Sequence, residues 1–320
     1  MTARIATIII GRNEGARLVA CLASVPKDRG EIVYVDSGST DGSVAAAREA
    51  GAKVVELDTS IPFTAARARN EGVSALEASH DYIQFIDGDC TLDAGWLDTA
   101  VAFLETTPKV GVVCGRRRER FPEASIYNRI CDVEWDMSLG TRVTCGGDSL
   151  MRFDMFKDAG GFLPSVIAGE EPELCARLRK AGWEIWRIEG EMTLHDAAIL
   201  KFGQYWKRCR RGGYAYAIGA DLHRLWVSRV VKALIWGVGL PLVIVLAVLL
   251  FGPVAWALVL IYPLQIARMA RGMDRDMHKD GFAWRYAVLI MVGKFAEAVG
   301  VLEFALKKLR GQTATIIEYK

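Results

Sequence analysis

The stretch from Ala233 to Ala267 contains no charged residue, and this apolar run constrains the fold more than any other feature of the chain. A single membrane-spanning helix needs about 20 apolar residues, so the run is too long for one core helix of a soluble protein. Gly252-Pro253 falls near its middle, where proline breaks or kinks a helix. The sequence therefore predicts two membrane-spanning helices joined by a tight bend.

Basic residues flank the apolar run on both sides. They are Arg224, Arg229 and Lys232 before it, and Arg268, Arg271 and Arg275 after it. Positive charge marks the cytoplasmic ends of membrane helices, so both ends are expected on the cytoplasmic side. One long kinked span is the alternative, but it would leave one basic cluster outside. We therefore expect a transmembrane helical hairpin over residues 223–272 in the cytoplasmic (inner or plasma) membrane.

The segment Phe282–Leu309 has a different pattern, because Arg285, Lys294, Glu297 and Glu303 interrupt its apolar residues. Charge inside a membrane is costly. An amphipathic helix in the bilayer interface is therefore favoured over a third span, within a terminal region of residues 273–320.

Before the apolar run, strand-like and helix-like patterns alternate. Strands are predicted at Ile5–Ile10, Glu31–Val35, Lys53–Leu57, Tyr82–Ile86, Val110–Cys114 and Glu184–Ile188, and helices at Ala16–Ser24, Ser43–Ala50, Thr64–Ala78 and Glu173–Lys180. Such alternation is typical of an α/β domain with a parallel sheet and right-handed crossovers. We expect this domain to cover residues 1–222.

The composition excludes several classes of protein. The net charge of +2 over 320 residues gives no reason to expect a nucleic-acid partner. The 7 cysteines are scattered without a Cys-x-x-Cys pair, which argues against a zinc cage or a disulfide framework and favours a reducing compartment. The apolar segment Ile5–Ile10 is too short for a signal peptide, so we expect the first domain to stay in the cytosol. The basic run Arg116-Arg117-Arg118 is interpreted as a solvated face.

The triplet Asp87-Gly88-Asp89 directly follows the predicted strand Tyr82–Ile86. Carboxylates at the carboxyl end of such a strand project where open α/β sheets bind ligands. A divalent cation that carries a diphosphate would match them, because Mg²⁺ is typically held by one or two carboxylates plus substrate oxygens. The alternative is a turn with two solvated aspartates.

Three further stretches place polar residues near the same edge. Arg12 and Asn13 follow the first predicted strand, and Asp36 follows the second and can accept hydrogen bonds from a base or a ribose. Arg69 lies in the third predicted helix, where its guanidinium group could reach a diphosphate.

These stretches, in this order and with the Asp87-Gly88-Asp89 triplet, resemble glycosyltransferase family 2 over roughly residues 3–215. The resemblance implies the GT-A fold, a doubly wound and mostly parallel sheet, with a UDP- or GDP-linked sugar as donor, Mg²⁺ or Mn²⁺ as cofactor, and inversion at the anomeric carbon. By position, Arg12, Asn13, Asp36, Arg69, Asp87, Gly88 and Asp89 would form the donor site, with Asp87 and Asp89 as metal ligands. Many members carry two adjacent acids where this chain has Asp36-Ser37, which leaves the nucleotide open.

The same resemblance extends to later segments. Gly146, Gly147 and Asp148 match the acceptor side, although an ordinary turn is the alternative. Glu171 occupies the position of the family's general base, with Glu170 in reserve because glutamate replaces the usual aspartate. Compensation of the helix dipole is the structural alternative for these acids.

Two basic or titratable segments complete the predicted site. His195 would be a third metal ligand, although a lone histidine is often structural. Arg208 and Arg211 resemble a segment that closes over diphosphate or acceptor. A basic surface helix drawn to anionic membrane lipids is the alternative for them, and both can hold together.

The sequence thus predicts a membrane-anchored inverting glycosyltransferase. It would move a sugar to a hydroxyl of a lipid-linked or polysaccharide acceptor in cell-envelope or exopolysaccharide synthesis. A sugar nucleotidyltransferase would need a glycine-rich loop after the first strand, which Gly11-Arg12-Asn13-Glu14 is not. A non-catalytic membrane scaffold is the other alternative, and the retained acidic residues argue against it.

Overall fold

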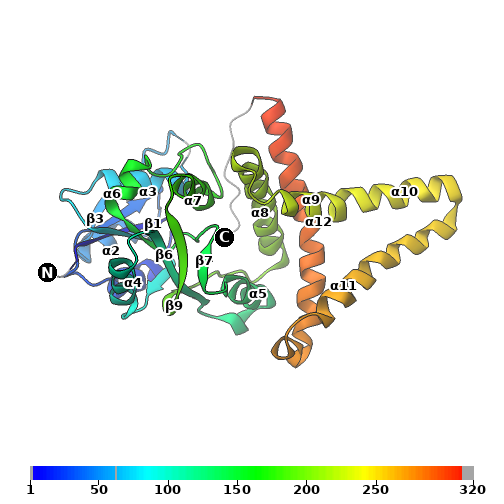
Figure 1. The fold of residues 1–320 in the computed structure, drawn as a ribbon, viewed down its shortest axis with the longest axis horizontal. Coiled ribbons are helices and arrows are strands. Elements are labelled where there is room, and N and C mark those ends of the chain that lie inside the picture. Colours follow the sequence, from blue (N-terminus) through cyan, green and yellow to red (C-terminus); the bar gives the residue numbers. More distant parts are fainter. Residues whose placement is uncertain (1–2, 62, 312–320) are drawn as a thin grey trace. The chain divides into compact units, whose positions relative to one another are not determined.

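The computed structural model describes residues 3–61 and 63–311, which form two compact units divided after Ala198 (Figure 1). Our predicted catalytic domain ends later, at residue 222. The intervening helix α8 (Phe202–His223) belongs to the second unit because it packs along α12 (Phe282–Leu309).

The first unit is built around one mixed sheet, whose strand order in the described part of the chain is β3-β2-β1-β4-β8-β6-β9-β5, with β7 paired to β9. The strands are β1 (Ile5–Gly11), β2 (Ile32–Asp36), β3 (Lys53–Glu56), β4 (Tyr82–Asp87), β5 (Cys90–Leu92), β6 (Val110–Glu119), β7 (Gly140–Arg142), β8 (Ser149–Arg152) and β9 (Glu184–His195). The β3-β2-β1-β4 half is parallel, as predicted. Beyond it, β8 runs antiparallel to both β4 and β6.

Helices cover this sheet (Figure 1). They are α1 (Ala16–Ser24), α2 (Ser43–Glu49), α3 (Ala65–Ser74), α4 (Trp96–Thr106), α5 (Ile126–Trp135), α6 (Phe153–Asp158) and α7 (Glu170–Lys180), with a short 3₁₀ turn at Pro122–Ala124. Thr64 caps α3, because its Oγ1 accepts a hydrogen bond from the backbone N–H of Arg67 at 2.9 Å. A Cβ at Gly72 would lie 2.5 Å from a methyl of Ile8, so glycine lets α3 approach the sheet closely.

Two strands and one helix extend beyond their predicted ends. β6 continues to Glu119 and β9 to His195, because the apolar pattern used to predict them stops where charged residues begin. α7 starts at Glu170, three residues before the predicted Glu173. The polar ends that the pattern missed are the parts that carry candidate site residues.

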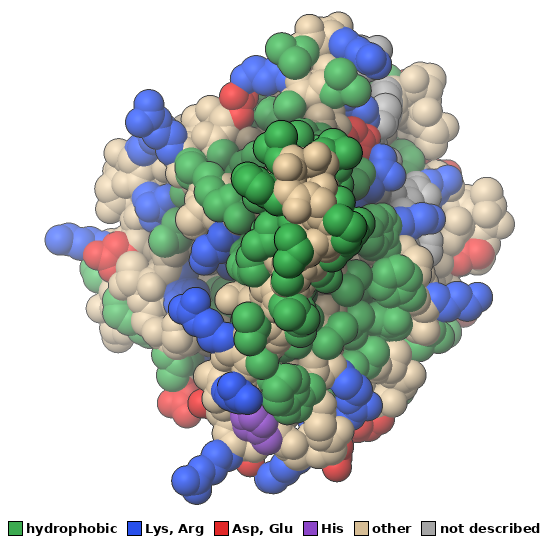
Figure 2. All heavy atoms as spheres, turned by 90° about the vertical axis from the view of Figure 1, so that its right-hand side faces the viewer, with side chains coloured by type: hydrophobic (Ala, Val, Ile, Leu, Met, Phe, Trp, Pro, Cys, Tyr) green, Lys and Arg blue, Asp and Glu red, His purple; other side chains and the backbone are tan. Residues whose placement is uncertain are grey.

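The second unit contains the predicted hairpin. Its elements after α8 are α9 (Val227–Leu234), a π-helical turn (Ile235–Gly239), α10 (Leu240–Phe251), η3 (Pro253–Leu260), α11 (Ile261–Arg271), η4 (Arg275–Gly281) and α12. Among the described residues, two helices are long and apolar enough to cross a membrane, Val227–Phe251 and Pro253–Arg271. Gly252 links them at φ 79, a backbone conformation that glycine adopts readily. Figure 2 shows the hydrophobic side chains gathered on this hairpin, and Leu249 is 76% exposed.

The helix α12 packs one face closely against α8. A Cβ at Gly213 would lie 2.0 Å from the carbonyl oxygen of Glu297, and one at Gly300 would lie 2.0 Å from that of Arg210. Arg210 also forms an ion pair with Glu303 at 2.7 Å. A helix is therefore present over the predicted range Phe282–Leu309, and its place in the bilayer interface stays a prediction. Gly213 of α8 and Gly300 of α12 form a glycine seam between the two helices.

Candidate active site

The parallel strands bring the predicted acidic residues to one edge of the sheet. In the strand register, Gly11 of β1 pairs with Asp36 of β2, and Ile10 of β1 pairs with Asp87 of β4. Two strand spacings therefore separate Asp36 from Asp87, about 10 Å between backbones. The strand ends meet at the edge where ligands bind in sheets of this kind.

The first two loops at this edge are joined through Asn13. Its side-chain oxygen accepts a hydrogen bond from the backbone N–H of Thr40 at 2.8 Å, and its own N–H donates to Ser39 Oγ at 2.8 Å. Asn13 has φ 56, which asparagine tolerates better than most residues. The exposed Arg12 places its guanidinium group 5.0 Å from the centre of the Phe63 ring.

The Asp36 carboxylate shapes the second loop. It accepts hydrogen bonds from the Tyr34 hydroxyl at 2.9 Å and from the backbone N–H groups of Gly38 and Ser39 at 2.9 Å and 2.7 Å. Asp36 is buried, so these bonds compensate its lost hydration. A direct contact with a nucleotide stays a prediction, whereas the support of the loop is part of the fold.

Arg69 contacts three carboxylates from two other segments. Its guanidinium nitrogens lie 2.9 Å from Asp87 at the end of β4, and 2.9 Å from both Glu170 and Glu171 at the start of α7. The side chain is only 2% exposed. Because one buried cation holds these acids together, the predicted donor residue Arg69 and the predicted base Glu171 belong to one cluster.

Arg117, which the sequence analysis assigned to a solvated face, also lies in this cluster. Its Nη2 is 3.3 Å from Asp87 and its Nε is 3.5 Å from Asp148, and its guanidinium group lies 4.9 Å from the centre of the Trp135 ring. Residues on a strand alternate between its two faces. Of the run Arg116-Arg117-Arg118, only the middle residue therefore turns toward Asp87. Extending the predicted strand β6 through this run would have revealed it.

The segment Gly146–Asp148 lies against the same charges. Asp148 accepts hydrogen bonds from the backbone N–H of Asp87 at 3.1 Å and from the Thr193 hydroxyl at 2.8 Å. A Cβ at Gly147 would lie 2.6 Å from Arg69 Nη2 and 3.0 Å from Glu171 Oε1. Asp148 thus fixes the backbone of Asp87 through a hydrogen bond. Gly147 has no side chain, which leaves room for the ion pairs of Arg69.

Asp89 and His195 form a buried pair beside this cluster. Their Oδ2 and Nε2 atoms are 3.1 Å apart, and Cys90 Sγ lies near both. Burial and the nearby Arg117 lower the pKa of His195 to about 3, so the imidazole is neutral and able to bind a metal. By contrast, both carboxylate oxygens of Asp87 already contact arginines.

The carboxylate of Asp89 and the imidazole of His195 suit a divalent cation such as Mg²⁺ or Mn²⁺. A carboxylate oxygen matches both ions, and a neutral imidazole is also a common ligand of transition metals. Keeping the buried Asp89 carboxylate ionised is costly, and a bound cation would lower that cost. Asp89 and His195 fit a metal better than Asp87, whose charge is balanced by Arg69 and Arg117.

The two glutamates at the start of α7 differ in their surroundings. The Glu171 side chain is 13% exposed and that of Glu170 5%. Burial and the neighbouring Glu170 raise the pKa of Glu171 to about 7, and Arg69 opposes this rise. A carboxylate with a pKa near neutrality is suited to take up a proton during catalysis. Arg208 and Arg211 lie on α8 in the second unit, and their acceptor role stays a prediction.

Comparison with known proteins identifies the family. Residues 7–160 match the family model described as "Glycosyl transferase family 2". The chain is also similar to Glycosyltransferase AglE of Haloferax volcanii, with 26% identity over 72% of this chain and 79% of that protein. Residues 7–160 thus form a glycosyl transferase family 2 domain, and the chain is a glycosyltransferase.

Other relatives of this glycosyltransferase agree. The Succinoglycan biosynthesis protein ExoA of Rhizobium meliloti is 30% identical over 55% of this chain and 57% of its own. The fold resembles that of the mannosyltransferase PcManGT from Pyrobaculum calidifontis, solved in complex with GDP-Man and Mn2+. The TM-score is 0.60, with 17% identity over 94% of this chain and 88% of that one. The predicted GT-A fold is therefore confirmed.

Proposed function

We propose that this glycosyltransferase moves a sugar, with inversion, from a nucleoside-diphosphate sugar to a hydroxyl of a lipid-linked or polysaccharide acceptor. The observation that carries the proposal is the Arg69 cluster. It holds Glu171 beside Asp87, at the sheet edge that also carries Asp36 and Asp89. An inverting transfer needs a carboxylate on the acceptor side that takes the hydroxyl proton while a diphosphate leaves opposite.

Each residue of the site has a task in this scheme. Glu171 takes the proton of the acceptor hydroxyl, and Arg69 holds it in place. The loop shaped by Asp36 and joined through Asn13 receives the nucleotide, with the exposed Arg12 at its rim. Asp89 and His195 would hold the divalent cation, which would neutralise the negative charge of the leaving diphosphate. The solved mannosyltransferase with GDP-Man and Mn2+ supports a nucleotide-sugar donor and a divalent metal.

A screen of UDP- and GDP-linked sugars, each with Mg²⁺ or Mn²⁺, tests the donor and the metal site together. A donor present at 100 times its dissociation constant should stabilise the full-length protein by about 2.7 kcal/mol in thermal unfolding. Changing a residue that only supports a metal ligand typically weakens metal affinity by about 10-fold to 100-fold. Asp89→Asn and His195→Gln each alter a proposed ligand itself, so each should weaken metal affinity by more than that.

The control for the metal site is Asp58→Asn, because the exposed Asp58 carboxylate accepts a hydrogen bond from the backbone N–H of Ser60, in the loop after β3. It should leave metal affinity unchanged. If no nucleotide sugar stabilises the protein, or if Asp89→Asn binds the metal as tightly as the unchanged chain, the proposed mechanism is wrong.

We further propose that the hairpin anchors the enzyme with its catalytic unit on the cytoplasmic leaflet. The two apolar helices and the basic residues at both ends of the hairpin support this. We expect the full-length enzyme in liposomes to use lipid-linked acceptors at least tenfold faster than water-soluble ones of the same sugar, because anchoring raises the local concentration of the acceptor. Equal rates on both acceptors would contradict the proposed use of lipid-linked substrates.

A further inference from the structure

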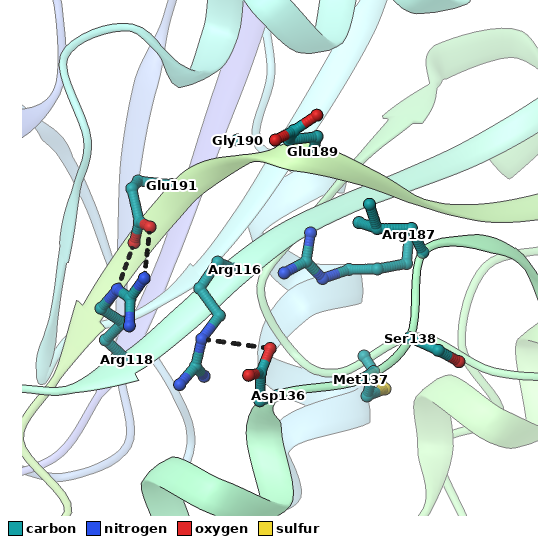
Figure 3. A pocket seen from close by; sticks show the side chains of 10 residues that line it. Arg116, Arg118, Asp136, Met137, Ser138, Arg187, Glu189, Gly190 and Glu191 are labelled. Carbon is teal, nitrogen blue, oxygen red and sulfur yellow. Dashed lines mark hydrogen bonds and ion pairs between the residues drawn. The ribbon is translucent and has the colours of Figure 1, made fainter. Parts of the chain in front are cut away.

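A pocket lies beside β6 and β9, next to the loop that follows α5 (Figure 3). Its volume is about 620 Å³, within the range of small-molecule sites. A bulge of β9 forms part of the pocket wall. Cys114 pairs with Arg187 and Arg116 pairs with Glu191, so Gly115 alone faces the three residues 188–190. Bulges of this kind are common next to active sites.

The strand β6 separates this pocket from the catalytic cluster. Arg117 contacts Asp87 and Asp148 of that cluster, whereas its neighbours Arg116 and Arg118 line the pocket. The pocket is therefore a second site, on the other face of the strand that supplies Arg117.

The charges in the pocket are not all balanced. Arg118 forms two hydrogen bonds with Glu191, both of 2.7 Å. Arg116 contacts Asp132 at 3.1 Å and Asp136 at 3.4 Å. Within residues 3–61 and 63–311, Arg187 takes part in no ion pair, and Figure 3 shows Glu189 directed away from its guanidinium group.

Arg187 is buried, with only 4% of the residue exposed, and it is directed into the pocket (Figure 3). Its Nη1 donates a hydrogen bond to the carbonyl oxygen of Ile188, while its Nε has no hydrogen-bond partner in the described part of the chain. Burial and the nearby Arg116 lower the pKa of Arg187. A buried cation without a carboxylate is costly, and an anion would relieve that cost.

We propose that this pocket binds an anionic group, a carboxylate or a phosphate carried by a sugar-sized molecule, through Arg187 with Arg116 beside it. The planar guanidinium group matches both anions with two parallel hydrogen bonds. The anion has two possible sources, a charged sugar of the acceptor or a free small molecule, and the experiments distinguish them.

Thermal unfolding of the full-length protein in detergent tests the pocket, with inorganic phosphate and glucuronate as probes. At least one probe should raise the melting temperature of the unchanged protein. Arg187→Met should lose this rise, with affinity reduced by about tenfold to a hundredfold. Without any anion, Arg187→Met should melt at the same or a higher temperature, because it removes an uncompensated buried charge.

Arg48→Met is the matched control, because Arg48 forms an exposed pair with Glu56 away from the pocket. It should keep the full response to the probe. Should Arg187→Met fail to fold, Arg187→Lys keeps the charge but loses the paired donors, and it should also bind more weakly. The proposal is overturned if neither probe stabilises the unchanged protein. It is also overturned if Arg187→Met responds as strongly, since the anion would then bind elsewhere.

Transfer assays distinguish the two sources of the anion. If the acceptor supplies it, Arg187→Met should raise KM for acceptors with a carboxylate or phosphate and leave KM for neutral acceptors unchanged. If a free molecule supplies it, phosphate should change the rate with both kinds of acceptor, and only when Arg187 is present. This arm depends on the proposed function, whereas the melting experiment does not, so the two can fail separately.

Discussion

Replacing Arg69 with methionine is expected to abolish sugar transfer and to lower the free energy of unfolding by about 3–5 kcal/mol. Arg69 is the buried cation that contacts Asp87, Glu170 and Glu171, each at 2.9 Å. Methionine preserves much of the side-chain volume but leaves the three carboxylates without this partner. Their mutual repulsion disappears as they become protonated, so the loss of stability should be smaller at acidic pH. Urea unfolding at several pH values, together with a transfer assay, measures both effects.

Arg67→Met on the same helix is the control. Arg67 donates hydrogen bonds to the backbone carbonyls of Asp58 and Ile61 at 2.9 Å and 3.0 Å, and it is outside the Arg69 cluster. Its replacement should cost about 1 kcal/mol and leave transfer intact. Arg69→Lys should recover only part of the activity, because one ammonium group cannot contact three carboxylates with the geometry of a guanidinium group. A fully active Arg69→Met enzyme would remove the basis of the proposed site.

Glu171→Gln is expected to lower kcat by about 10²-fold to 10⁴-fold, with little change in the KM of the donor. Glutamine keeps the size of the side chain but cannot take up the acceptor proton. Removing one acid from a cluster with two other carboxylates should not prevent folding, so the loss should reflect chemistry. Steady-state kinetics over both substrates separates the effect on kcat from the effects on binding.

The pH profile distinguishes Glu171 from Glu170. The base acts in its ionised form, and the pKa of Glu171 is raised to about 7. For the unchanged enzyme, kcat/KM should therefore rise tenfold per pH unit below about 7 and level off above it. Glu171→Gln should remove this dependence, and Glu170→Gln should keep it. If Glu170→Gln instead removes it, the role of base passes to Glu170.

Much of the fold was predictable because its signals are local. The apolar strands β1, β2 and β4 and the helix α1 were found within one residue of their ends, because their buried faces give regular patterns. The hairpin was equally visible, since no charge interrupts residues 233–267.

The candidate site was only partly predictable, because long-range contacts decide it. Arg69 and Glu170 are 101 residues apart in the chain, and no local pattern indicates that they meet. Arg117 was missed because a run of three arginines looks like a charged surface until the strand is known to continue through it. The pocket around Arg187 is lined in part by a bulge of β9, and composition does not reveal the shift of strand register at that bulge.

The glycine seam between α8 and α12 has a consequence for where these helices can function. Contacts between bare backbones depend on close van der Waals fit, and they do not require water to be expelled from oily surfaces. Such an interface keeps its strength when acyl chains replace water around it. The close fit between α8 and α12 should therefore persist whether water or lipid surrounds that contact.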